Sequence, residues 1–207
     1  MSFQYANTDV PAPSTPLPDE ISIIAQPGTD IWRKPPSHIA FNAPILYRSI
    51  SLLTFRKARV TVSSEWKTLY DQGGLILVLP QPDGNNKKWI KMGIEFFNNK
   101  PHVGIVACDR WADWSLLPIE GSSATIEIAR ESGTDGKLSS ALWVYLIEGA
   151  ERKPLREITW VFENADAKGA DIEECWVGLY AAKPKENEAR PDEALKVFFT
   201  HLDVETS

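Results

Sequence analysis

The sequence predicts an all-β protein folded as an antiparallel β-sandwich or barrel. Short runs of β-branched and aromatic residues recur along the chain, separated by clusters of Pro, Gly, Asn and Asp. No window carries the long apolar stripe of period 3.6 that marks an amphipathic helix. The length of 207 residues suits a single β-rich domain. Many short strands with almost no helix favour a sandwich or a barrel.

The first 19 residues are expected to form an extended, Pro-rich leader. Residues 6–19 (ANTDVPAPSTPLPD) hold four prolines and few side chains that could pack. The first alternating apolar run begins directly afterwards. We therefore expect one β-sandwich domain over residues 20–207.

The expected strands follow in order, each rich in Val, Ile, Leu or aromatic residues and bounded by turn formers. They cover residues 21–25, 45–47, 52–62, 75–79, 89–97, 102–108, 114–117, 125–129, 142–147, 158–162, 175–181 and 196–201. The charged segment 183–193 (KPKENEARPDE) is expected to be a solvated loop before the last strand.

One hairpin can be predicted down to its register. The dipeptide Asn98-Asn99 tolerates positive φ at both positions and can close a two-residue turn. Paired residue numbers then sum to 197, which places the apolar side chains of both strands on one face. The opposite face carries Trp89, Lys91, Glu95 and His102, together with two bare glycines.

A similar alternation in residues 142–146 separates Trp143 and Tyr145 from the apolar side chains of that strand. Aromatic rings beside polar groups suit hydroxyl-rich ligands such as sugars, because a ring stacks on C–H patches while polar groups bind hydroxyls. The alternative is that these rings form a second layer of core under an outer strand or loop. Both interpretations stay open at this point.

Glu95 and His102 are predicted to stand directly opposite each other, close enough for a hydrogen bond. Such a pair could act as a general base and its orienting partner, with Lys91 beside it. A plain cross-strand pair on a solvated sheet is the simpler alternative. The paired Glu-x-Asp-x-x-Glu acids of sandwich glucanases do not occur in the sequence, which disfavours that retaining chemistry.

Composition narrows the classes of partner. The formal net charge is −6, with no basic stripe of the kind that binds nucleic acid. The two cysteines form no metal-binding motif, and no nucleotide-binding or hydrolase motif occurs, so we expect neither a metal nor another cofactor. No signal-peptide pattern and no apolar span of bilayer length is present, which predicts a cytoplasmic protein without a membrane partner.

Several blocks of sequence resemble the DUF1349 family, also called the regulation of enolase protein 1 family. They are Thr29-Asp30-Ile31-Trp32-Arg33, Tyr70-Asp71-Gln72-Gly73-Gly74-Leu75, Trp89-Ile90-Lys91-Met92-Gly93-Ile94-Glu95, Ala112-Asp113-Trp114-Ser115 and residues 176–184 (WVGLYAAKP). The family usually shows Ala at position 73 and Ser at position 112.

The resemblance implies a concanavalin A-like lectin/glucanase fold, a jelly roll of two curved antiparallel sheets. It implies only a loose association with carbohydrate metabolism and no defined activity. If ligands bind on the concave sheet, as is usual in such sandwiches, the expected ligand-binding residues are Tyr70, Gln72, Trp89, Lys91, Glu95, His102, Trp143 and Tyr145.

Three functions remain open from the sequence. The first is an intracellular binding protein for a carbohydrate or a similar hydroxylated metabolite. The second is a cofactor-independent isomerase, cyclase or lyase in which Glu95, His102 or Lys91 moves a proton. The third is a protein-interaction module that uses the aromatic face. A closed cleft with a buried Glu95 favours the enzyme, an open groove the binding protein, and a flat aromatic patch the interaction module.

Overall fold

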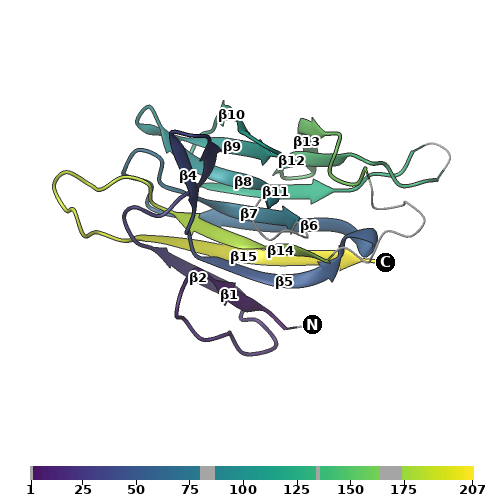
Figure 1. Ribbon diagram of the computed structural model, residues 1–207, viewed down its shortest axis with the longest axis horizontal. Coiled ribbons are helices and arrows are strands. Elements are labelled where there is room, and N and C mark those ends of the chain that lie inside the picture. The colour runs from purple at the N-terminus through teal and green to yellow at the C-terminus, as the bar shows by residue number, and fades with distance from the viewer. Residues whose placement is uncertain (1, 80–86, 134–135, 164–173) are drawn as a thin grey trace.

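A computed structural model gives the structure of the chain and describes residues 2–79, 87–133, 136–163 and 174–207 (Figure 1). Two sheets pack face to face, and all pairings between their strands are antiparallel. The all-β antiparallel sandwich predicted from the sequence is confirmed.

Among the described residues, the first sheet has seven strands. In spatial order they are β1 (Gln4–Ala6), β5 (Ile45–Ser51), β14 (Glu174–Ala182), β7 (Gln72–Leu79), β8 (Lys88–Phe97), β9 (Lys100–Cys108) and β10 (Ala112–Pro118). The second sheet has six strands within the same described ranges. In spatial order they are β13 (Glu151–Ile158), β12 (Leu142–Glu148), β11 (Ser123–Ala129), β6 (Phe55–Ser63), β15 (Leu195–Thr206) and β2 (Glu20–Ala25).

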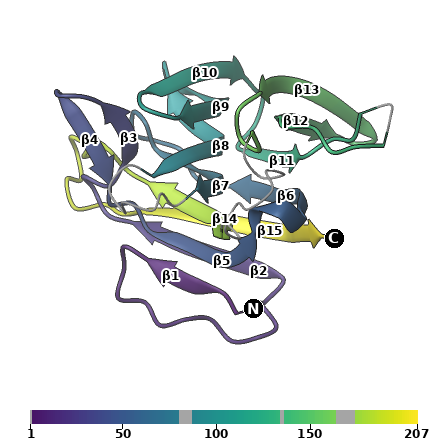
Figure 2. The ribbon, with the colours of Figure 1, turned by 45° about the vertical axis from the view of Figure 1, so that its right-hand side comes forward.

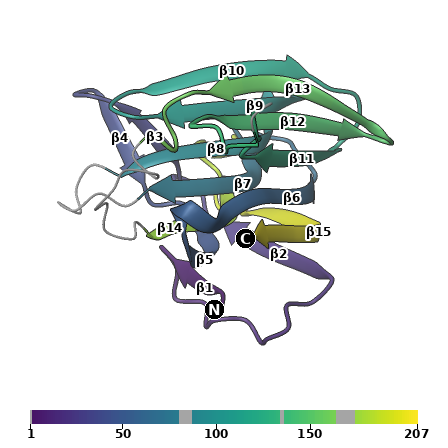
Figure 3. The same cartoon turned by 90° about the vertical axis from the view of Figure 1, so that its right-hand side faces the viewer.

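The main core lies between the two sheets, where aliphatic side chains from both inner faces meet. Ile90, Met92 and Ile94 of β8 belong to it, as the alternation predicted. One edge of the sandwich is closed by an ion pair between Arg156 of β13 and Asp113 of β10. Nη2 of Arg156 lies 2.6 Å from Oδ2 of Asp113. Figure 3 shows these two edge strands side by side.

A separate hairpin covers part of the outer face of the seven-stranded sheet. Its strands are β3 (Ile31–Lys34) and β4 (His38–Phe41), and it stands at one end of that sheet, away from the six-stranded sheet (Figure 2). A second apolar cluster lies on this outer face and includes Ile31 of β3 and Trp89 of β8. This hairpin was not among the strands predicted from the sequence.

The predicted β8–β9 register is confirmed. Trp89 pairs with Cys108 and Glu95 with His102, so the numbers sum to 197 along the whole hairpin. The turn residues Asn98 and Asn99 have φ of 50° and 60°, the left-handed values that a two-residue turn of this kind requires.

Other boundaries differ from the expectation. Gln4–Ala6 of the leader pair with β5, so the leader contributes an edge strand. Residues Leu52–Thr54 form a short 3-10 helix, η1, before β6. Residues 159–162 form a turn, while β13 occupies the preceding charged segment Glu151–Ile158. A charged strand bearing Pro154 is tolerated there because β13 is an edge strand.

Candidate functional site

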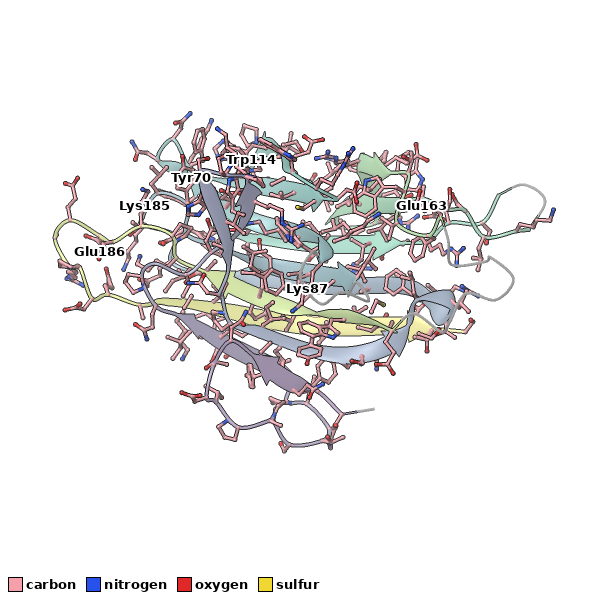
Figure 4. The ribbon with its side chains drawn as sticks, in the orientation of Figure 1. Tyr70, Lys87, Trp114, Glu163, Lys185 and Glu186 are labelled. Atoms are coloured by element: carbon pink, nitrogen blue, oxygen red, sulfur yellow. The ribbon has the colours of Figure 1, made fainter. Side chains whose placement is uncertain are left out.

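A pocket of about 310 Å³ opens on the outer face of the seven-stranded sheet, beside the β3–β4 hairpin. Its lining residues come from the hairpin, from the start of β7, from β8, from β10 and from the segment after β14. They are Asp30, Trp32, Lys34, His38, Tyr70, Gln72, Lys91, Glu95, Trp114, Pro184 and Lys185. Figure 4 shows Tyr70, Trp114 and Lys185 at the same end of the molecule, around the hairpin.

Three aromatic rings form one side of the pocket. The Trp114 ring meets the rings of Trp32 and Tyr70 edge to face, with centroids 6.2 and 6.3 Å apart. The ring of Phe97 also meets the Trp114 ring edge to face, with the ring centroids 5.4 Å apart. Edge-to-face contacts at these distances fix the orientation of each ring. The pocket therefore presents a preformed aromatic wall.

The backbone of Tyr70 has a φ of 69°, a left-handed value that is uncommon for a residue with a side chain. Its N–H donates to the carbonyl of Phe96 at 2.8 Å, and its own carbonyl accepts from Nε2 of Gln72 at 3.2 Å. These bonds hold the turn in place. The unusual conformation lies directly at the pocket, where backbone strain often accompanies function.

Lys91 lies at the base of the pocket with a side chain only 3% exposed. Its Nζ donates to Oε1 of Gln72 at 2.6 Å and lies 3.7 Å from Oδ1 of Asp30. Burial lowers the pKa of Lys91, while the charges of Asp30 and Glu95 act in the opposite direction. The ammonium group is thus held by one amide and one carboxylate.

Glu95 is the second buried ionisable group of the base. Its Oε2 accepts from Nε1 of Trp114 at 3.0 Å. Burial raises the pKa of Glu95 to about 7, against the opposing effects of the Lys91 charge and of the Trp114 hydrogen bond. The carboxyl group can therefore exchange a proton near neutral pH.

Glycine at position 104 leaves room for this carboxylate. A Cβ at Gly104 would lie 3.0 Å from Oε2 of Glu95 and 3.3 Å from its Cβ. The Glu95 side chain thus covers Gly104, one of the two bare glycines on this face of the hairpin. Gly93 is not open either, because a Cβ there would lie 2.0 Å from the carbonyl oxygen of Gly73 on the neighbouring strand.

Asp30 is fixed at the entrance to β3. Its Oδ1 accepts from the N–H of Ile31 at 2.7 Å, and its Oδ2 lies 3.5 Å from Nε2 of His38. The N–H of Asp30 donates to Oδ1 of Asn42 at 2.8 Å, across the base of the hairpin. Asp30 therefore joins the hairpin to the buried Lys91.

A buried ion pair holds the segments around the pocket together. Nζ of Lys183 lies 3.0 Å from Oδ1 of Asp71, and both side chains are 2% exposed. The backbone of Lys183 contacts the loop before β3: its N–H donates to Oγ1 of Thr29 and its carbonyl accepts from Gly28. Because Asp71 lies between Tyr70 and Gln72, this pair ties three lining segments to one another.

Comparison with known proteins assigns this architecture to a family. Residues 10–207 match the family described as "Protein of unknown function (DUF1349)". The chain belongs to the DUF1349 family. An uncharacterized protein of Emericella nidulans is 52% identical to this DUF1349 chain over 170 residues, which cover 81% of this chain and 79% of the relative.

Solved structures share the fold of this DUF1349 protein at low sequence identity. A functionally unknown protein from Saccharomyces cerevisiae has a TM-score of 0.71 at 18% identity, over 100% of this chain and 97% of the other. The GH43B protein of a Bacteroides ovatus xyloglucan locus has a TM-score of 0.63 at 11% identity, where the match covers 100% of this chain but 37% of the other. A pseudo β-1,3-glucanase of Mycobacterium tuberculosis, Rv0315, reaches 0.54 at 9% identity, over 100% of this chain and 91% of the other.

Four of the residues expected from the sequence meet in the pocket of this DUF1349 protein: Tyr70, Gln72, Lys91 and Glu95. Asp30, Trp32 and Trp114 join them, although these three were not among the ligand-binding residues expected from the sequence. Their segments are two of the blocks that resemble the family, so the resemblance was the signal that could have found them.

The expectation that Trp89 faces an open hollow is wrong. Trp89 lies on the predicted face of β8, but its side chain is 1% exposed and packs in the second apolar cluster with Ile31 and Cys108. The β3–β4 hairpin supplies the cover. The alternative of a second core layer therefore holds for Trp89.

His102 pairs with Glu95 in register, but the expected contact between their side chains is replaced by others. The Glu95 carboxylate accepts from Trp114, while Nδ1 of His102 lies 3.0 Å from the carbonyl oxygen of Lys100. His102 is buried against the ring of Phe97, and it is not part of the pocket lining. An orienting role of His102 towards Glu95 is not supported by this geometry.

Trp143 and Tyr145 lie far from this site in the topology. They belong to β12 of the six-stranded sheet, so the expectation that they share a ligand-binding sheet with Glu95 is corrected. Their rings stack on each other, and the hydroxyl of Tyr145 donates to Oε1 of Glu131 at 2.9 Å. The guanidinium of Arg152 lies 3.6 Å from the centre of the Tyr145 ring.

In the part of the chain that the structure describes, no three His, Cys, Asp or Glu side chains gather as a metal ion would require. Within the same ranges, no helix has the length and hydropathy of a bilayer span.

Proposed function

We propose that this DUF1349 protein binds a small hydroxylated molecule, of the carbohydrate class, in the pocket beside the β3–β4 hairpin. One observation carries the proposal: Lys91, Gln72 and Glu95 lie buried at the base of a hollow whose side wall is aromatic. Perturbed ionisable groups in a cleft are typical of functional sites.

The chemistry of the wall and of the base suits a sugar. The faces of Trp114 and Tyr70 can stack on the C–H side of a ring, while the amide and carboxyl groups below bind its hydroxyls. A volume of about 310 Å³ is sufficient for one or two sugar units and lies at the lower end of the usual range for ligand pockets. Proteins of similar fold include a xylan β-1,4-xylosidase, which supports the ligand class by analogy of fold only.

Isothermal titration calorimetry with a panel of neutral mono- and disaccharides tests the proposal. Trp114→Ala is expected to weaken binding at least tenfold, because it removes the stacking surface and the partner of Glu95. Trp143→Ala is the matched control, since it removes an equally half-buried indole from the other sheet. The proposal is overturned if no sugar binds, or if Trp143→Ala weakens binding while Trp114→Ala does not.

Proton transfer by Glu95 is a second candidate function, favoured by its position and by its raised pKa. A carboxyl group with a pKa near the working pH is an efficient general acid or base. The reaction class would be an isomerisation or elimination on the bound sugar, with Lys91 as the neighbouring cation.

Glu95→Gln separates the two candidate functions. For an enzyme, this substitution abolishes turnover of a bound sugar, followed by NMR over hours, while binding is kept. For a binding protein, no sugar of the panel changes in the presence of the wild-type protein.

A further inference from the structure

Acidic and basic side chains lie at different depths in the pocket. The formal net charge of the whole chain is −6. The carboxyl groups of Asp30 and Glu95 lie towards the base, on the same side as the buried Lys91. The exposed side chains of Lys34 and Lys185 line the mouth. The pocket thus contains three lysines and His38 against two carboxyl groups.

The buried lysine and the two mouth lysines differ in their partners. The ammonium of Lys91 is already held by Gln72 and Asp30 at the base. By contrast, neither Lys34 nor Lys185 has an ion-pair partner among the residues that the structure describes. Both are therefore available to a charged ligand.

The two mouth lysines stand on elements that the fold holds in place. Lys34 ends β3 and pairs with His38 across the hairpin, so two basic side chains stand together at its tip. Lys185 follows closely on Lys183, whose ammonium is buried against Asp71 and whose backbone is bonded to Thr29 and Gly28. The cations are thus carried on the two segments that flank the opening.

This arrangement gives a charged ligand one favourable orientation. An anionic group at the base would meet the carboxyl groups of Asp30 and Glu95, whereas at the mouth it meets unpaired ammonium groups. Hydroxyls at the base can instead donate to those carboxyl groups and accept from the second N–H of Gln72 Nε2. The sugar ring of such a ligand, between its anionic group at the mouth and its hydroxyls at the base, would then lie against Tyr70 and Trp114.

We propose that the ligand is an acidic sugar: a hydroxylated ring that carries one carboxylate or phosphate group, bound with this anion between Lys34 and Lys185 at the mouth. This inference rests on the proposed function and specifies its ligand class. Lysine ammonium groups bind either anion as point charges, so carboxylate and phosphate are separate arms of the test.

The experiment compares two matched series of three probes by calorimetry: D-glucose, D-glucuronate and glucose 6-phosphate, and the corresponding galactose compounds. We expect one acidic member to bind roughly tenfold more tightly than its neutral parent, the sum of two partly exposed charge contacts. Raising the salt concentration from 50 to 500 mM should reduce this preference, because the mouth is open to solvent.

The double variant K34Q/K185Q is expected to bind acidic and neutral members alike. The control K57Q/K153Q removes the same total charge from β6 and β13 of the other sheet, and it should keep the full preference. Equal binding of neutral and acidic sugars by the wild type, or an undiminished preference in K34Q/K185Q, overturns the acidic-sugar inference alone. Absence of binding by every probe overturns the proposed function with it.

Discussion

The outer face of the seven-stranded sheet has two halves that share strand β8 and differ in polarity and in what lies over them. In the covered half, Trp89 is packed with Ile31 and Cys108 under the β3–β4 hairpin. In the pocket half, Glu95 and Lys91 line a hollow with an aromatic wall. The face of a strand thus decides only which side a residue points to. The element packed over that side decides whether it is core or site.

Loss of stability on substitution should distinguish the covered half from the pocket half. Trp89→Ala should lower the free energy of unfolding by about 3–5 kcal/mol, because it opens a cavity in the second apolar cluster. Trp114→Ala should cost about 1–2 kcal/mol, since its half-buried ring leaves a gap that water can enter. Urea unfolding of the two variants measures both values. Equal losses of unfolding free energy in the two variants would mean that Trp89 and Trp114 are packed alike, and would contradict the distinction between the two halves.

The next effect concerns what holds the pocket half together. Asp71→Asn should lower the free energy of unfolding by about 3 kcal/mol, because it leaves the ammonium of Lys183 buried without a counter-charge. The double variant Asp71→Asn with Lys183→Met should recover part of that loss, as it removes both charges. Urea unfolding of the single and double variants tests this. A loss below 1 kcal/mol in Asp71→Asn would show that the ion pair does not organise the pocket.

A smaller effect uses the titration of Glu95. The pKa of Glu95 is raised from 4.5 to about 7 in the folded protein, so between these pH values the folded state binds more protons than the unfolded chain. This group therefore lowers stability as the pH rises through that window, by roughly 2–3 kcal/mol in total. The stability of Glu95→Gln relative to the wild type should rise by that amount from pH 5 to pH 8. A difference that stays constant with pH would refute the raised pKa.

The fold could be predicted from the sequence because strand alternation is a local signal. Both strands of the Asn98-Asn99 hairpin agree on one register, and the inner face of β8 is as expected. Edge strand β13 was missed because its charged residues and Pro154 lack that alternation, whereas residues 160–162 (WVF) have apolar side chains but form a turn. The turn at 159–162 still buries Phe162, which stacks on Phe55.

The site could be predicted only in part, because the β3–β4 hairpin gives no periodic signal. Its strands are four residues each and are joined by the turn that contains Pro35-Pro36. This hairpin brings Asp30 and Trp32 to the pocket and covers Trp89, so its omission caused both errors. The assignment of Trp143 and Tyr145 failed for another reason: alternation reveals two faces of a strand but not the sheet to which the strand belongs.

The indole N–H signals of the eight tryptophans offer the most direct test of the distinction between the two halves. In a proton–nitrogen correlation spectrum, with signals assigned by single Trp→Phe variants, a bound hydroxylated ligand should shift the indoles of Trp114 and Trp32. Those of Trp89 and Trp143 should stay in place. Shifts confined to Trp143, with Trp114 and Trp32 unmoved at saturation, would contradict a binding site in the pocket.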